Sequence, residues 1–270
     1  NSTLRPEQGL LKLRKELGLY ANLRPVKSYG QLVEFSPLKK DRIENVDMLI
    51  VRELTGGLYF GEKKSTKTSA SDLCEYSIHE IERVTEIAVN YAKIRRKKIT
   101  LIDKANVLET SRIWIKTVQN ISKKHSDIKF EYMFVDNAAM QMIINPKQFD
   151  VILTENLFGD IISDEASVIC GSIGILCSSS IGKNRGLFEP IHGSYPQAKN
   201  KNIANPIATI LSAGMMLEFL NLNEESRIIK KAVNISLENK ISTADLNENN
   251  PSTTSEVGDY ISKKIREESL

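Results

Sequence analysis

Residues 154–166 read TENLFGDIISDEA, and both the expected fold and the expected chemistry can be developed outward from this stretch. The residues before it, 149–153 (FDVIL), form a short apolar run that predicts a buried strand. Gly159 predicts a turn, and we expect Asp160 to cap the helix that follows. Asp164 lies four residues further on, so the spacing places both carboxylates on one face of that helix.

Two carboxylates on one helix face repel each other unless a cation lies between them. Beyond the end of a strand, Mg²⁺ or Mn²⁺ is the simplest such cation, because both ions bind carboxylate oxygens. A helix cap beside a solvated acid explains the same pair of residues. The spacing alone leaves both interpretations open.

Three other apolar runs also end in charged residues. They are 46–51 before Arg52, 99–102 before Asp103 and Lys104, and 130–135 before Asp136. In open α/β sheets, ligands bind beyond the carboxyl ends of the strands. Four such strand ends, carrying charges of both signs, favour one shared polar site over four unrelated points where solvent begins.

The alternation of these runs with helical spacing predicts an α/β fold with a largely parallel sheet and right-handed crossovers. Helices are expected to start at Pro6 and near 78, 113, 207, 224 and 254, and the polar stretch 61–73 is expected to be exposed. The Gly- and Ser-rich segment after 166 is the expected domain crossing. The chain contains no GxGxxG motif, which argues against a Rossmann fold.

Composition excludes several classes of protein. The chain has 270 residues and a net charge of +3, with acids and bases interspersed, so we expect no nucleic-acid partner. No apolar run is long enough to span a membrane and no signal peptide is visible, so we expect no membrane partner. Cys74, Cys170 and Cys177 lack metal or disulfide spacing, which favours buried thiols of a cytoplasmic protein.

Two sets of side chains remain open to more than one interpretation. Arg14, Arg24 and Arg52 would suit a substrate with two carboxylates, because guanidinium groups bind carboxylates in a bidentate manner. Each arginine taken singly is equally well explained as surface charge. His192 lies alone in a loop, and a single histidine is more often structural than catalytic.

Eight separated segments, in order along the chain, resemble one known family. The segments are LRPEQGLLKLRK, ANLRP, VRELTGGLYFGE, DKANVLE, FVDNAAMQ, NLFGDIISDEAS, EPIHGS and NIANPIATILSA. They resemble the β-decarboxylating dehydrogenases of the isocitrate/isopropylmalate dehydrogenase family, and within it the branch that oxidises 3-isopropylmalate. The family's opening strand and helix units have no counterpart here, so the chain resembles an N-terminally truncated member.

The resemblance implies a two-domain α/β fold with mixed, largely parallel sheets. Residues 1–19 and 171–270 would form the cofactor-side domain, and residues 20–170 the central domain for substrate, metal and dimerisation. The implied reaction is oxidative decarboxylation of (2R,3S)-3-isopropylmalate to 2-oxoisocaproate with reduction of NAD⁺, a step of leucine biosynthesis. It also implies a homodimer, in which each subunit contributes residues to its partner's site.

The resemblance further implies a role for individual residues. Tyr59 and Lys104 would be catalytic, Tyr59 as a proton donor and Lys104, in the neighbouring site, as the general base. Substrate would be bound by the carboxylate-binding arginines Arg14, Arg24 and Arg52, by Glu7, Leu10, Leu11 and Val107 around the isopropyl group, and by Asn106 and Asp136. Asp160 and Asp164, with Asp136 of the partner subunit, would hold Mg²⁺ or Mn²⁺. NAD would be bound by Glu189, His192, Gly193, Ser194, Pro196, Gln197 and Asn205.

The resemblance leaves alternatives and one departure from the family pattern. Gln197 stands where most NAD-dependent members carry an aspartate, so NAD should be preferred over NADP less strongly than usual. A related 2-hydroxy acid such as D-malate, tartrate, homoisocitrate or isocitrate is an alternative substrate. A non-catalytic regulatory subunit or an inactive truncated homologue is a second alternative, although the residues matched to catalysis and metal binding are all present.

Overall fold

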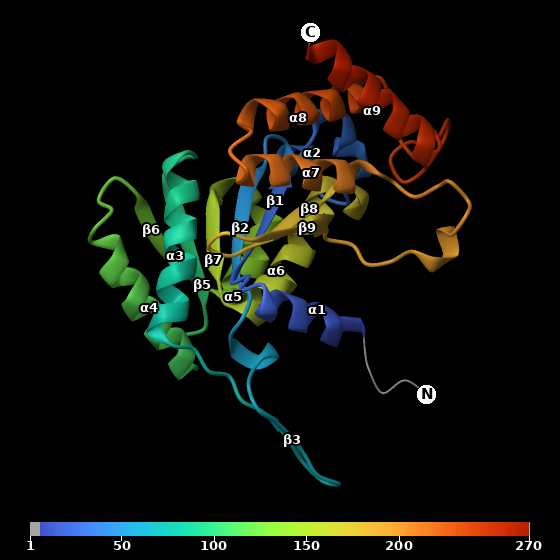
Figure 1. The fold of residues 1–270 in the computed structure, drawn as a ribbon. Helices are drawn as coiled ribbons and strands as arrows, with labels where there is room; N and C mark the ends of the chain where they lie inside the picture. The colour runs from blue at the N-terminus through green and yellow to red at the C-terminus, as the bar shows by residue number, and fades with distance from the viewer. Residues whose placement is uncertain (1–5, 270) are drawn as a thin grey trace. The chain divides into compact units, whose positions relative to one another are not determined.

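The computed structural model describes residues 6–269, and the side chains of 9–169 and 171–269 among them (Figure 1). The chain divides into two compact units. Unit 1 comprises 1–23, 48–165 and 180–186, and unit 2 comprises 24–47, 166–179 and 187–270. The expected division grouped 1–19 with 171–270. That division stays a prediction. In the structure, α1 (Pro6–Glu16) belongs to unit 1, and Tyr20 O, a few residues after it, accepts a hydrogen bond from Leu54 N–H.

The strands form a seven-stranded sheet in the order β6-β5-β7-β2-β1-β8-β9. Its unit 1 strands are β2 (Asp47–Glu53), β5 (Lys98–Asp103), β6 (Lys129–Phe134) and β7 (Val151–Thr154), all paired in parallel. In the register, Arg52 lies opposite Thr154 and Asp103 opposite Phe134, so these strands end at one edge. The predicted strands and their parallel α/β arrangement are confirmed.

Helices α3 (Ile78–Lys93) and α4 (Glu109–Ser122) pack against these strands and against each other. A capping box between Ser77 and Glu80 starts α3, where sequence alone had indicated only a helix. The apolar faces of both helices are buried, and Trp114 of α4 meets the ring of Tyr76 edge-on at 5.5 Å. Two further helices of unit 1, α5 (Val135–Ile144) and α6 (Asn156–Ser167), begin just beyond the ends of β6 and β7.

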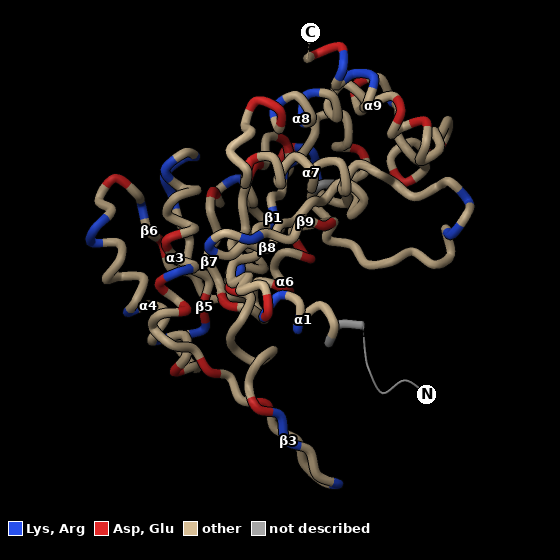
Figure 2. The backbone as a smooth tube through the Cα atoms, viewed as in Figure 1, with Lys and Arg blue, Asp and Glu red and all other residues tan. Residues whose placement is uncertain are grey.

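The predicted exposed excursion is a hairpin. Strands β3 (Lys63–Ser65) and β4 (Ala70–Asp72) pair antiparallel, every residue in them is exposed, and the hairpin projects from the rest of unit 1 (Figure 1). An isolated two-stranded hairpin is at best marginally stable in water. Lys63 and Lys64 of β3 are exposed, and Figure 2 shows basic residues on the hairpin.

Unit 2 is mainly helical. Helices α7 (Ile207–Phe219), α8 (Asn223–Glu238) and α9 (Thr254–Glu268) pack consecutively, and α7 buries residues on most of its surface, as predicted. The remaining elements are the short helix α2 (Lys40–Ile43) and the 3₁₀ turns η1 (Gly30–Phe35), η4 (Val168–Cys170), η5 (Ile173–Ile175) and η6 (Pro196–Ala198). Strands β1 (Ala21–Lys27), β8 (Cys177–Ile181) and β9 (Gly186–Pro190) are divided between the two units. Helix α9 carries Glu256 in its first turn and Arg266 in its last turn, which suits the helix dipole, and two further acids, Glu267 and Glu268, follow Arg266.

The prediction that Asp160 caps a helix after a turn at Gly159 is wrong. Helix α6 already begins at Asn156, so Gly159 and Asp160 lie inside it. The side chain of Glu155 accepts a hydrogen bond from Phe158 N–H and so takes the capping position. The expected spacing of Asp160 and Asp164 by one helical turn still holds, because both residues belong to α6. Within the described residues, no helix has the length and apolar character needed to cross a membrane.

Candidate active site

Three side chains of unit 1 meet at the carboxyl end of the sheet. Arg52 comes from the end of β2, Tyr59 from the 3₁₀ turn η2 (Gly57–Tyr59), and Asp160 from α6. The guanidinium of Arg52 donates to Oδ1 of Asp160, and the hydroxyl of Tyr59 donates to Oδ2 at 2.5 Å. The guanidinium carbon of Arg52 lies 5.4 Å from the centre of the Tyr59 ring. A cation, an anion and a phenol therefore share one small polar centre.

The pKa of Tyr59 is raised, first by burial and then by its hydrogen bond to the Asp160 carboxylate. The bond favours the protonated phenol because the neutral hydroxyl donates to a negatively charged acceptor. At neutral pH Tyr59 is a neutral phenol, as an unshifted tyrosine also would be, and it therefore has a proton to donate.

Arg52 is 2% exposed and is held by Asn156. Its Nε donates to the backbone oxygen of Asn156 at 2.8 Å and to Oδ1 at 3.1 Å, and its Nη2 donates to Oδ1 at 2.8 Å. Gly159 lies against the aliphatic part of the same arginine, where an added Cβ would be 2.5 Å from Arg52 Cγ. This contact explains why a glycine occupies the middle of α6.

The loop that carries Tyr59 is tied down by Glu53. The carboxylate of Glu53 accepts bonds from Thr55 N–H, Thr55 Oγ1 and Gly56 N–H, each at 2.8 Å. Tyr76 packs on the other side, since a Cβ at Gly56 would lie 2.6 Å from its ring and one at Gly57 2.3 Å from its hydroxyl. Gly57 also has a positive φ of 68°, which a residue with a side chain rarely adopts.

A second acid, Glu155, is buried near Glu53. Burial, followed by repulsion from the charge of Glu53, raises the pKa of Glu155 to about 7. Burial likewise raises the pKa of Glu53, opposed by its hydrogen bonds and by Arg83. Cys74 Sγ lies 4.0 Å from Glu155 Oε2, and burial followed by that charge raises the pKa of the thiol. Cys74 is partly exposed and Cys177 is buried, so the expectation of buried thiols holds for Cys177 and not for Cys74, and the side chain of Cys170 lies outside the described ones.

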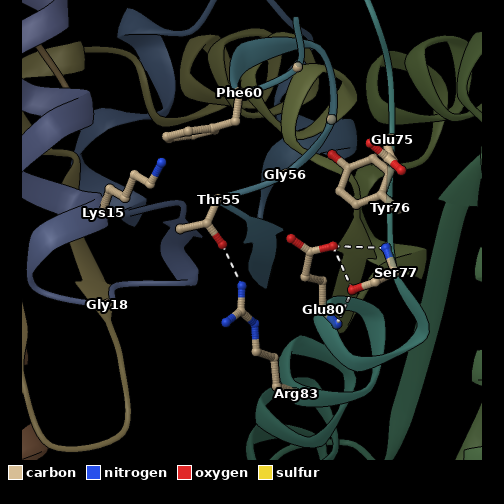
Figure 3. Close-up of a pocket in the computed structure, with 12 residues that line it drawn as sticks. Lys15, Gly18, Thr55, Gly56, Phe60, Glu75, Tyr76, Ser77, Glu80 and Arg83 are labelled. Atoms are coloured by element: carbon tan, nitrogen blue, oxygen red, sulfur yellow. Dashed lines mark hydrogen bonds between the residues drawn. The ribbon is translucent and has the colours of Figure 1, made fainter.

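The loop carrying Tyr59 has a cavity of about 500 Å³ on one side (Figure 3). Lys15, Phe60, Tyr76 and Arg83 are among the residues that line it. Figure 3 shows Arg83 reaching from α3 to Thr55 Oγ1, at 2.5 Å. Arg83 also lies 3.8 Å from Glu53 and over the ring of Tyr20. These contacts brace the loop from the side of α3.

A second charged pair of unit 1 combines Lys104 and Asp136, which lie 2.9 Å apart. Lys104 follows β5, and Asp136 is in the first turn of α5. Their hydrogen bond lowers the pKa of the Asp136 carboxyl. Asn106 and Val107 follow Lys104 in an exposed turn. The structure therefore brings together, at one place, the residues assigned to a neighbouring subunit's site.

The two acids of α6 fit a divalent cation in the nature of their donors. Asp160 and Asp164 offer carboxylate oxygens one turn apart, and Asp164 is exposed. A carboxylate has roughly four acceptor positions, so an oxygen that accepts from Arg52 or Tyr59 can also bind a metal. Within the described residues, no group of three or more His, Cys, Asp or Glu side chains could hold a metal. Further ligands would have to come from substrate, water or another chain.

The other expected substrate residues are only partly placed. Arg14, Leu10 and Leu11 lie on α1 in unit 1 and are half-buried, whereas the side chain of Glu7 lies outside the described residues. Arg24 is 8% exposed in β1 and belongs to unit 2. Its approach to Arg14 and Arg52 stays a prediction.

The expected cofactor residues all belong to unit 2. Glu189 is the last residue but one of β9. A loop with His192, Gly193 and Ser194 follows, and Pro196 and the exposed Gln197 lie in η6. Asn205 precedes α7, where its Oδ1 accepts from Ile207 N–H and its Nδ2 donates to Asp245, both at 3.0 Å. Asp245 also accepts bonds from Ser172 and Thr243, at 2.6 Å each. Binding of NAD by these residues stays a prediction.

Sequence reasoning missed three residues of these networks: Asn156, Glu155 and Asp245. Asn156 carries a usable signal, because an asparagine directly after a buried strand often starts a helix and offers both a donor and an acceptor. For Glu155 and Asp245 the contacts that matter to these networks, with Glu53 and with Ser172 and Asn205, are distant in sequence and leave no local signal.

Arginine, tyrosine, lysine and aspartate side chains gather beyond the ends of parallel strands in this α/β chain. Such an arrangement is typical of α/β proteins that bind small acidic ligands at strand ends. The chain belongs to the isocitrate/isopropylmalate dehydrogenase family, whose model matches residues 1–261. This match also confirms the predicted family resemblance.

Individual relatives support this assignment. A protein of Bacteroides fragilis named 3-isopropylmalate dehydrogenase is 49% identical over 265 residues, covering 97% of this chain and 75% of its own length. One of the same name from Carboxydothermus hydrogenoformans is 52% identical over 273 residues, covering 97% and 72%. The crystal structure of isocitrate dehydrogenase from Methylococcus capsulatus superposes with a TM-score of 0.88 and 36% identity, covering 95% of this chain and 76% of that one.

Proposed function

We propose that the protein catalyses the oxidative decarboxylation of 3-isopropylmalate to 2-oxoisocaproate, with reduction of NAD⁺, in leucine biosynthesis. The observation that carries the proposal is the cluster of Arg52, Tyr59 and Asp160, in a chain about half identical to proteins named 3-isopropylmalate dehydrogenase. We expect the cytoplasmic location inferred from the sequence.

Arg52 supplies the carboxylate-binding group. Five N–H groups are available on a guanidinium. Asn156 and Asp160 accept from one N–H on each of its three nitrogens, and Tyr59 is a further hydrogen-bond partner of the guanidinium. The outer N–H groups of the two terminal nitrogens are the ones that a carboxylate would engage. Two donors of this kind suit the two oxygens of a carboxylate. Arg14 and Arg24 would bind alongside.

The proton transfers fall to Lys104 and Tyr59. Lys104 of the partner subunit, once it has given up its own proton, would take the proton of the C2 hydroxyl while C2 loses hydride to NAD⁺, and the nearby Asp136 carboxylate would orient its side chain. After CO₂ leaves, Tyr59, which is a neutral phenol at neutral pH, would give its proton to C3. When bound, Mg²⁺ or Mn²⁺ at Asp160 and Asp164 stabilises negative charge on the substrate oxygens.

The proposed substrate follows from the apolar residues on α1. Leu10 and Leu11 offer an apolar wall to an isopropyl group. A third carboxylate, as in isocitrate, would be buried there without a partner, which costs several kcal/mol. D-malate, tartrate and homoisocitrate differ at the same position and are the alternatives to be compared.

A homodimer is part of the proposal, because unit 1 exposes apolar side chains next to Lys104 and Asp136. Phe134, Met140, Ile143 and Ile144 of β6 and α5 are between 43% and 55% exposed, and Val107 is 63% exposed. Exposed apolar patches of this kind mark interfaces in soluble proteins. In a homodimer that buries these side chains between the two copies, Lys104 of one subunit would reach the active site of the other.

The direct test is the formation of NADH and 2-oxoisocaproate from 3-isopropylmalate, with Mg²⁺ or Mn²⁺ present, by the complete protein. Tyr59→Phe and Lys104→Ala should each lose most of this activity, whereas mixed dimers of the two should recover part of it. A protein that forms neither product would contradict the proposed reaction. Absence of recovery in verified mixed dimers would contradict the shared sites. Turnover by the parent would also exclude the alternative that the protein is a non-catalytic regulatory subunit.

A further inference from the structure

We propose that Asn156 is a positioning residue, which holds the Arg52 guanidinium and the Tyr59 loop in the one arrangement that binds and converts substrate. The inference deepens the proposed function and rests on it, since it assigns a supporting role around the group that grips the substrate carboxylate. Asn156 itself touches no substrate in this account. It acts through Arg52 and Tyr59.

The first observation is how Asn156 grips Arg52. Its Oδ1 accepts from Nε at 3.1 Å and from Nη2 at 2.8 Å, so one side-chain oxygen holds one whole edge of the guanidinium. Its backbone oxygen accepts from Nε at 2.8 Å. Fixing this edge orients the remaining donors on the terminal nitrogens. A long, flexible arginine is thereby prepared for a bidentate ligand before the ligand arrives.

The chemical nature of the amide is the second observation. Asp160 also binds Arg52, but as a carboxylate that neutralises part of its positive charge. Asn156 holds the guanidinium with a neutral oxygen and leaves its charge available to the substrate. An aspartate at position 156 would place a second negative charge on the edge of Arg52 and weaken its attraction for an anion.

The third observation connects Asn156 with the catalytic loop. Its Nδ2 donates to Gly56 O at 3.2 Å, three residues before Tyr59, and its backbone N–H donates to Tyr76 Oη at 3.0 Å. Tyr76 in turn packs against Gly56 and lines the cavity in Figure 3. Asn156 is 1% exposed, so water cannot readily replace these bonds. One buried amide thus links the end of β2, the Tyr59 loop and the start of α6.

Three variants separate these bonds. Asn156→Ala removes both side-chain links, and we expect the KM for 3-isopropylmalate to rise about tenfold or more, a smaller fall in kcat, and an unchanged KM for NAD. Asn156→Asp keeps an acceptor for Arg52 but adds charge and loses the bond to Gly56. Tyr76→Phe keeps the ring and removes only the bond to the Asn156 N–H, so its effect should be smaller.

The matched control is Val118→Ala. Val118 is fully buried in α4, and in the described part of the chain α4 supplies none of the hydrogen-bond partners of Arg52, Tyr59 or Asn156, so truncation of Val118 tests destabilisation alone. It should lower the unfolding midpoint and leave both KM values unchanged. An equal rise in the KM for 3-isopropylmalate in Val118→Ala would overturn the positioning role, because general loosening would then explain it.

A readout independent of turnover is the Nε–H resonance of Arg52 in protein labelled with ¹⁵N-arginine, assigned by its loss in Arg52→Lys. We expect slow exchange with water in the parent and in Asn156→Asp, and fast exchange in Asn156→Ala. An unchanged resonance in Asn156→Ala would overturn the proposal. A parent that fails to turn over 3-isopropylmalate would refute the proposed function, while this resonance would still decide whether Asn156 orders Arg52.

Discussion

The hydroxyl of Tyr59 donates to the same Asp160 carboxylate that pairs with Arg52, at an O–O distance of 2.5 Å. The group proposed to give a proton is therefore bonded to the group proposed to bind a metal. Metal binding at Asp160 would change the acceptor of the Tyr59 hydroxyl at the moment the site is filled.

Gly159→Ala should impair activity although alanine favours helices. Alanine is better than glycine in a helix interior by about 1 kcal/mol. The added Cβ, however, would lie 2.5 Å from Arg52 Cγ, so the arginine must move. We expect kcat/KM to fall about tenfold or more. Gly214→Ala in α7 is the control, since its Cβ would meet Ser226 Oγ at 3.5 Å, an ordinary contact. Equal activity of the two variants would contradict this account of Gly159.

Glu155 should make the protein less stable as pH rises. Its folded pKa of about 7 lies above the unfolded value near 4.5, so its stabilising effect is complete below about 4.5 and is lost as pH rises through about 7. The loss corresponds to about 3 kcal/mol at most. In urea unfolding, we compare the free energy of unfolding of Glu155→Gln with that of the parent. The difference in favour of Glu155→Gln should be larger at pH 8 than at pH 5. Glu248→Gln, at an exposed position, should show no such trend. The same difference at both pH values for Glu155→Gln would refute the raised pKa.

Divalent cations should stabilise the parent but not its acid variants. A ligand that binds only the folded state raises its stability, by about 2.7 kcal/mol at a hundred times Kd. We expect Mn²⁺ to raise the Tm of the parent, and Asp160→Asn and Asp164→Asn to lose most of that rise together with metal-dependent turnover. Asp259→Asn, at an exposed position of α9, should respond as the parent does. Full activity of either acid variant in EDTA would refute the metal assignment.

Gln197→Asp should strengthen the preference for NAD. A neutral glutamine can accept a bond from the adenosine ribose but does not repel a 2′-phosphate, whereas an aspartate would, at a cost of about 1 kcal/mol or more to NADP. The ratio of kcat/KM with NAD to kcat/KM with NADP should therefore rise about fivefold or more, because kcat/KM with NADP falls. Asn200→Asp adds the same charge to the same loop and serves as the control. An unchanged ratio would show that Gln197 does not face the ribose.

The strands and most helices could be predicted because their signals are local. The runs before Arg52 and Lys104 are apolar and β-branched, and α3 and α4 show helical spacing. The start of α6 could not be predicted, because Gly159 is typical of a turn unless one knows that Arg52 packs against it.

The candidate site was predictable in its members and not in its connections. Arg52, Tyr59 and Asp160 were all selected from sequence, but their shared hydrogen bonds depend on the meeting of β2, η2 and α6. Asn156 was missed for the same reason, since its partners lie up to about a hundred residues away along the chain.

Substrate preference tests the central claim most directly. The measurement is kcat/KM for 3-isopropylmalate, D-malate and isocitrate, each with NAD and Mg²⁺, on the same preparation of the complete protein. The apolar wall of Leu10 and Leu11 should make 3-isopropylmalate the best substrate, and isocitrate poorer by about a hundredfold or more, because its third carboxylate would be buried unpaired. Equal or greater efficiency with isocitrate would contradict the account.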